Sequence, residues 1–165
     1  MASNHDDHEA LVRRHDVPFH LLPVDPDDPA TQSRQMHELV SSSGVDLVVL
    51  ARYMRILPAP FVEEFRHRVI NIHHSFLPAF VGAKPYQQAW ERGVKLIGAT
   101  AHYATADLDE GPIIHQDVTP VSHRHEVADL VRLGADLERT VLARAVRLHL
   151  EHRVLTYANR TVVFD

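Results

Sequence analysis

Residues 45–51, Val-Asp-Leu-Val-Val-Leu-Ala, form a short apolar run rich in β-branched side chains, which is typical of a buried strand. They follow Gly44, and residues 30–43 have a helical pattern, so the stretch predicts a helix, its cap and a strand in succession. Further strands are predicted over 19–24, 69–72 and 95–103, with helices over 6–15, 58–65 and 85–92. Alternating helices and strands predict the α/β class, with a mainly parallel sheet flanked by helices.

The C-terminal part of the chain has a different pattern. Apolar residues recur at three- and four-residue steps over 125–152, which predicts a long amphipathic helix lying along the sheet. Two β-like segments, 154–157 and 161–164, flank Asn159-Arg160 and predict a small terminal hairpin. No repeat or low-complexity tract interrupts the sequence, so we expect a single domain over residues 1–165.

The composition excludes several classes of protein. The chain has 165 residues, 45% of them hydrophobic, which suits a globular domain with a sizeable core. A formal net charge of -5 leaves no surplus of cations for a nucleic-acid backbone, and the absence of cysteine excludes disulfides and thiolate chemistry. The start is polar and acidic, and no apolar run has the length of a membrane span. We therefore expect a soluble cytoplasmic protein with no nucleic-acid or membrane partner.

Familiar catalytic motifs are missing from the sequence. The glycines are too scattered for a dinucleotide-binding motif or a P-loop, and no serine stands in Gly-x-Ser-x-Gly. Each His-Glu pair lacks the second histidine of the zinc-protease motif. Fourteen histidines leave a metal-binding protein as an alternative, with His73-His74 or His123 and His125 as candidate ligands. We nevertheless expect no metal site and no cofactor.

Three polar residues follow predicted strands. Asn71 and His73 are two residues apart at a strand end, so both side chains can face the same side. Asp109 lies in an acidic turn after the strand 95–103 and can reach the same crevice if the strands are neighbours. Amide, imidazole and carboxylate together supply an oxyanion donor, an acid or base, and a group that tunes its proton. The set predicts acyl transfer or hydrolysis without a covalent nucleophile, and ordinary roles in turns and strand ends are the alternative.

Four strings in the sequence resemble a known family. They are ARYMRIL at 51–57, NIHHSFLPAFVGAKPYQQA at 71–89, GVKLIGATAHY at 93–103 and LDEGPII at 108–114. They are similar to the catalytic domain of the formyltetrahydrofolate deformylases, within the folate-dependent formyltransferase superfamily that also includes glycinamide ribonucleotide formyltransferase. The resemblance extends over nearly the whole chain. It implies a Rossmann-like formyltransferase sheet and the hydrolysis of 10-formyltetrahydrofolate to formate and tetrahydrofolate, supplying formate for purine biosynthesis.

The resemblance also implies roles for individual residues. The catalytic asparagine, histidine and aspartate of the superfamily fall on Asn71, His73 and Asp109. By this resemblance Asn71 and His73 donate hydrogen bonds to the oxyanion, while Asp109 accepts or relays the proton of water and favours the charged form of His73. The substrate-binding residues implied are Met54, Arg55, Ile56, Leu57 and Ala104, the last of which begins a loop that closes the other side of the folate. The partners implied are folate and water, and family members tend to form homo-oligomers.

The chain also departs from the family pattern. Its start resembles the end of the second strand of the family's catalytic domain. We therefore expect a chain that lacks the N-terminal regulatory ACT domain and the first β-α unit. Whether such a shortened chain is active by itself needs a test. His74 stands where the ribonucleotide transferase has proline, and residues 82–86 replace a histidine-containing stretch of that enzyme, which favours the deformylase. The alternatives are a formyltransferase acting on an amine such as glycinamide ribonucleotide, and an inactive folate-binding remnant.

Overall fold

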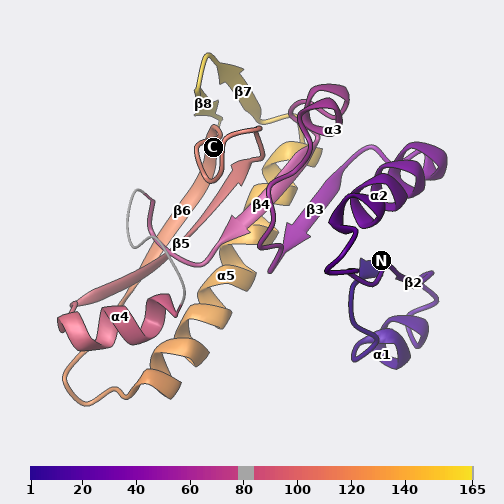
Figure 1. Ribbon diagram of the computed structural model, residues 1–165. Coiled ribbons are helices and arrows are strands. Elements are labelled where there is room, and N and C mark those ends of the chain that lie inside the picture. Colours follow the sequence, from indigo (N-terminus) through magenta and orange to yellow (C-terminus); the bar gives the residue numbers. More distant parts are fainter. Residues whose placement is uncertain (78–83, 165) are drawn as a thin grey trace. The chain divides into compact units, whose positions relative to one another are not determined.

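The computed structural model describes residues 1–77 and 84–164, and its contacts divide the chain into two compact units, Met1–Asp46 and Leu47–Asp165 (Figure 1). The single domain expected over residues 1–165 stays a prediction. Residues 82 and 83, part of the stretch that distinguishes the chain from the ribonucleotide transferase, lie outside the described residues.

The first unit combines two short parallel strands with two helices. Its elements are β1 (Ala2–Ser3), α1 (Glu9–Arg13), β2 (His20–Leu21) and α2 (Pro29–Ser43). Asp28 caps α2 by accepting a hydrogen bond from the Thr31 amide, and Gly44 ends the helix in the left-handed conformation, with φ at 60°. The helix predicted over 30–43 is thereby confirmed. The strand predicted over 19–24 is shorter, because a proline near each end lacks the N–H that a ladder requires.

The second unit is built on a mixed sheet. Its strand order is β3 (Val48–Ala51), β4 (Val69–His73), β5 (Leu96–Tyr103) and β6 (Ile113–Pro120). β3 and β4 are parallel, whereas β5 is antiparallel to both β4 and β6. The predicted parallel pairing therefore holds for β1 with β2 and for β3 with β4. The pairs β4–β5 and β5–β6 are antiparallel instead. The loop 104–112 is too short for the crossover that parallel neighbours need, so β5 and β6 pair as an antiparallel ribbon.

β6 is a strand that the sequence analysis does not predict. It is the last strand in the order of the described sheet, with one side unpaired. Ile114 is buried on it, while Asp117 and Val118 are exposed. Polar side chains on an edge strand weaken the apolar run on which the prediction depends.

One long helix covers a face of this sheet. The helix α5 (Val127–Leu150) confirms the prediction over 125–152, and it passes behind the strands in Figure 1. Its Val141 and Ala145 are fully buried in a core that they share with Ile70, Ala99 and Ala101 of the sheet. Removal of this apolar surface from water is the main force that holds helix and sheet together. The shorter helices are α3 (Ala59–Glu64) and α4 (Pro85–Arg92).

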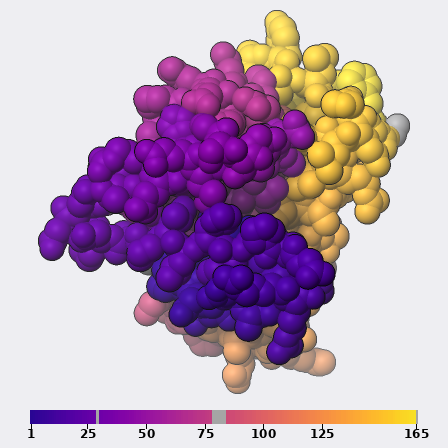
Figure 2. Space-filling view, turned by 90° about the vertical axis from the view of Figure 1, so that its right-hand side faces the viewer, coloured from indigo at the N-terminus to yellow at the C-terminus, as the bar shows by residue number. Residues whose placement is uncertain are grey.

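The chain ends in the predicted hairpin, formed by β7 (Val154–Tyr157) and β8 (Arg160–Val163). In the space-filling view, the last turns of α5 and the hairpin form one continuous yellow surface (Figure 2). The hairpin also touches the sheet, because the Thr161 hydroxyl donates a hydrogen bond to the Ile113 carbonyl at the start of β6. Within residues 1–77 and 84–164, no helix is long and apolar enough to cross a membrane.

Candidate active site

The candidate site begins on two adjacent strands. Asn71 and His73 lie on one side of β4, as their spacing predicts. The antiparallel register places His102 of β5 directly opposite Asn71. The Asn71 amide nitrogen lies 3.3 Å from His102 Nε2, so the two side chains are joined across the strands.

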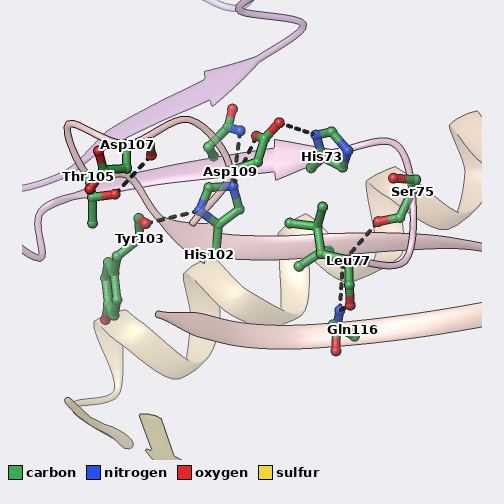
Figure 3. Close-up of polar contacts among 11 residues, drawn as sticks. His73, Ser75, Leu77, His102, Tyr103, Thr105, Asp107, Asp109 and Gln116 are labelled. Atoms are coloured by element: carbon green, nitrogen blue, oxygen red, sulfur yellow. Dashed lines mark hydrogen bonds and ion pairs between the residues drawn. The ribbon is translucent and has the colours of Figure 1, made fainter. Parts of the chain in front are cut away.

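Asp109 reaches these residues from the loop 104–112. Its Oδ2 lies 3.2 Å from His73 Nδ1, and its Oδ1 lies 3.6 Å from His102 Nε2 (Figure 3). Because β5 is antiparallel, Tyr103 at its carboxyl end faces Ile70 at the start of β4, and the loop must turn back to bring Asp109 to His73. The structure thus brings the three predicted catalytic residues together, although not at a shared carboxyl edge of parallel strands.

The hydrogen bonds of His102 determine which atom of the Asn71 amide is paired within the site. His102 Nδ1 lies 3.0 Å from the Tyr103 carbonyl oxygen, which can only accept, so Nδ1 carries the proton. In a neutral ring Nε2 is then an acceptor, and it receives one N–H of the Asn71 amide. The second N–H of that amide is not used by this contact. Asn71 Oδ1 is buried with no hydrogen-bond partner in the described part of the chain.

The imidazole of His73 is oriented in a similar way. Its Nδ1 donates to the Asp109 carboxylate, while its Nε2 is buried and has no hydrogen-bond partner among residues 1–77 and 84–164. A buried polar atom without a partner costs free energy, which a bound ligand can recover by pairing with it. Nε2 is therefore the atom through which we expect His73 to act.

Burial decides the charge of both histidines. It lowers the pKa of His73, and the nearby His74 and His102 lower it further, while Asp109 opposes the shift. Burial also lowers the pKa of His102. The sequence analysis expects Asp109 to favour the charged form of His73; the carboxylate does act in that direction, but desolvation outweighs it. The lowered pKa favours the neutral form of His73 at pH 7, and the contact with Asp109 favours the proton on Nδ1.

A pocket lies next to this cluster. It contains about 350 Å³ of empty space, part of it open to solvent, and includes the predicted residues Arg55, Ile56, Leu57 and Ala104 in its lining. Asn71, His102 and Asp109 form its polar end, together with the loop residues between Ala104 and Asp109. His73 is not part of the lining, but it contacts Asp109, which is. Met54 is outside the lining and 70% exposed, so its predicted role in binding has no support from its position.

The fold and pocket can be compared with known proteins. The sequence pattern described as Formyl transferase matches residues 1–146. This chain belongs to the formyl transferase family. Two formyltetrahydrofolate deformylases, from Synechocystis sp. and Bacillus subtilis, are 59% and 53% identical to it over 98% and 99% of its length. The chain covers 57% and 54% of those two proteins, so it spans about half the length of the curated relatives it matches.

Solved structures show the same relationship. A formyltetrahydrofolate deformylase from Pseudomonas syringae has a TM-score of 0.96 at 57% identity, with 99% of the present chain and 55% of the deformylase covered. Glycinamide ribonucleotide transformylase 1 from Symbiobacterium toebii has a TM-score of 0.89 at 37% identity, with 99% and 79% covered. The fold of this chain is therefore shared by deformylases and transformylases.

His102 is the site residue that sequence reasoning misses. It is 2% exposed and lies within a strand whose other residues after Leu96 are also buried. A histidine inside the buried strand LIGATAHY was an available signal, because a buried polar side chain needs a partner. Its partner could not be inferred, since the antiparallel register with β4 is not apparent from local pattern. Among the described residues, no three His, Cys, Asp or Glu side chains are placed to hold a metal ion.

The lowered pKa values predict that the chain loses stability in mild acid. His73 and His102 bind protons less readily when folded than when unfolded, where a histidine has a pKa of about 6.5. Stability is then fully present above pH 6.5 and falls as the pH drops toward the lower folded values. We expect a lower midpoint of thermal unfolding at pH 5.5 than at pH 7.5. The His102→Gln variant should show a smaller change over this interval, and an equal change would contradict the assignment.

Proposed function

We propose that this chain hydrolyses 10-formyltetrahydrofolate to formate and tetrahydrofolate. The observation that carries the proposal is the pairing of His73 with Asp109, which leaves a buried, unprotonated Nε2 without a partner among the described residues. A histidine held in this way can remove a proton from water, so no covalent nucleophile is needed. Relatives that share 50–59% of its sequence carry the name deformylase, which supports the choice of water as acceptor.

The pocket supports a folate ligand. Leu50, Ile56 and Leu57 offer apolar surface, while the main chain of the loop that begins at Ala104 offers donors and acceptors. Pockets that combine apolar walls with a few polar groups suit flat heterocyclic ligands. We infer that the pterin ring lies between these two walls, so that the formyl group is directed toward Asn71 and Asp109.

The proposed chemistry follows from the protonation states. Neutral His73 accepts a proton at Nε2 from the water whose oxygen bonds to the formyl carbon. Asp109 stabilises the resulting imidazolium through the Nδ1–H bond, and the free N–H of Asn71 donates to the developing oxyanion, a contact commonly worth about 100-fold or more in rate. Collapse of the intermediate breaks the C–N bond, and the proton moves from Nε2 to the leaving nitrogen. In this scheme His73 acts as a base rather than as a charged oxyanion donor.

The proposal is tested by formate release from 10-formyltetrahydrofolate by the purified, folded chain. We expect turnover without any amine, and addition of glycinamide ribonucleotide should change the rate by less than about twofold, because water needs no second substrate site. Folded chain that binds folate but releases no formate would support the inactive remnant instead.

Formyl transfer to an amine is the second candidate. It is favoured by the likeness to the Symbiobacterium toebii transformylase, 79% of which is covered by this chain. In the same assay a transferase would release tetrahydrofolate only when the amine is present, and the formyl group would appear on the amine rather than as formate.

Further aspects of the function are proposals of the same kind. We propose that the formate supplies purine biosynthesis, that the protein acts in the cytoplasm, and that it assembles as a homo-oligomer. The reaction has water as its only co-reactant, so we propose that it needs no cofactor.

A further inference from the structure

Asp109 has a backbone conformation that needs support from its surroundings. Its φ is 57°, in the left-handed region that residues with a side chain rarely adopt. Strained residues at functional sites persist only where neighbouring contacts determine them. The contact between His73 and Asp109 therefore depends on whatever holds the loop 104–112.

Two side chains of the C-terminal hairpin hold the descending part of this loop. Asn159, at the tip of the hairpin, donates from Nδ2 to the Glu110 carbonyl at 2.7 Å. Thr161, at the start of β8, donates from its hydroxyl to the Ile113 carbonyl. The two bonds enclose Gly111 and Pro112, so they fix the main chain directly after Asp109. We call this pair of bonds the hairpin clamp.

The ascending part of the loop is fixed by its own bonds. The Ala104 amide donates to the Val69 carbonyl at 2.9 Å, and the Thr105 hydroxyl donates to the Asp107 carbonyl at 3.0 Å. The Tyr103 amide closes the base of the loop by donating to the Pro112 carbonyl. Of the hydrogen bonds described here, only the Asn159 bond reaches the residue next to Asp109.

We propose that Asn159 and Thr161 are positioning residues that hold the Asp109 carboxylate against His73. This inference rests on the function proposed above, and it gives the hairpin a part in catalysis that its sequence does not indicate, since Asn159-Arg160 predicts only a turn. Neither side chain lines the pocket beside Asn71, whereas both line a second hollow together with Asp109 and Gly111. Because both donate to the main chain that follows Asp109, we expect their effect on the reaction to be exerted through the Asp109 loop.

The chain offers matched variants for a test. Thr161→Val removes the hydroxyl while keeping the β-branched shape that suits a strand, and Asn159→Ala removes the other donor. Thr161→Ser restores the hydroxyl. Thr156→Val makes the same change on the opposite strand of the hairpin, where the threonine hydroxyl contacts His67 rather than the loop.

We expect the clamp variants to lower kcat for formate release and to leave KM nearly unchanged. A displacement of a catalytic group by about 1 Å can cost about 100-fold in rate. We therefore expect kcat to fall about tenfold in Asn159→Ala and in Thr161→Val, and about 100-fold in the double variant that combines them. Thr161→Ser and Thr156→Val should stay within about twofold of the original chain. Equal losses in Thr156→Val and Thr161→Val, or a double variant with full kcat, would overturn the proposal.

A measurement without turnover separates this proposal from the proposed function. The pKa of His73 can be followed by nuclear magnetic resonance of its imidazole, which faces Asp109, His74 and His102. Asp109 is the group that raises this pKa, so its displacement in the double variant should lower the pKa further, as Asp109→Asn does. This shift is expected even if the chain releases no formate. An unchanged pKa in the double variant, beside a lowered one in Asp109→Asn, would refute the clamp alone.

Discussion

Replacement of Asp109 by asparagine is expected to lower formate release about 1000-fold while folate binding changes little. The carboxylate lies 3.2 Å from His73 Nδ1, where it favours the proton on that nitrogen, and in the proposed mechanism Nε2 then acts as the base. Asparagine keeps the shape but removes the negative charge that stabilises the imidazolium formed during the reaction. It can also present its amide to Nδ1, which would move the ring proton to Nε2 and abolish the base.

The measurement separates binding from chemistry. Single-turnover rates should fall by the full factor, while the dissociation constant for tetrahydrofolate, measured by fluorescence, should change by less than about threefold. Glu63→Gln is the matched control, because it removes one exposed carboxylate of α3 in the same unit without touching the site. Loss of folate binding with an unchanged single-turnover rate would contradict the catalytic role of Asp109.

Replacement of Gly111 by alanine is expected to destabilise the chain by about 3 kcal/mol and to lower activity as well. An added Cβ would overlap the Tyr103 carbonyl oxygen and lie 2.9 Å from the carbonyl carbon, and both are backbone atoms. They cannot move easily, because the Tyr103 amide is bonded to the Pro112 carbonyl and Tyr103 is paired with Ile70. The loop must therefore shift, and Asp109 shifts with it.

Thermal unfolding and formate release measure the two effects. For a chain of this size, about 3 kcal/mol corresponds to a fall of about 10 °C in the midpoint. Gly134→Ala is an informative comparison, since its Cβ would meet the hydroxyl end of Tyr86, a side chain that can rotate at the expense of its bond to Glu138. Its loss should be smaller. A Gly111→Ala chain with an unchanged midpoint would show that the loop main chain is not held against Tyr103.

The sequence alone determines the features that depend on neighbours along the chain. The helices α2, α4 and α5 follow from apolar spacing and from a cap such as Gly44, whose effect is local. The two-residue period of a strand predicts that Asn71 and His73 face the same side, and the structure agrees. The terminal hairpin follows from two β-like segments around a turn.

Only the tertiary structure decides the features that depend on which segments meet. The antiparallel register of β4 and β5 places His102 against Asn71, and the return of the loop brings Asp109 to His73. Neither follows from local pattern, because strand pairing is determined by packing between residues far apart in sequence. The pKa of His73 is shifted in the same way: the carboxylate beside it favours the cation, but burial by the folded chain removes the water that would stabilise that charge, so the pKa falls.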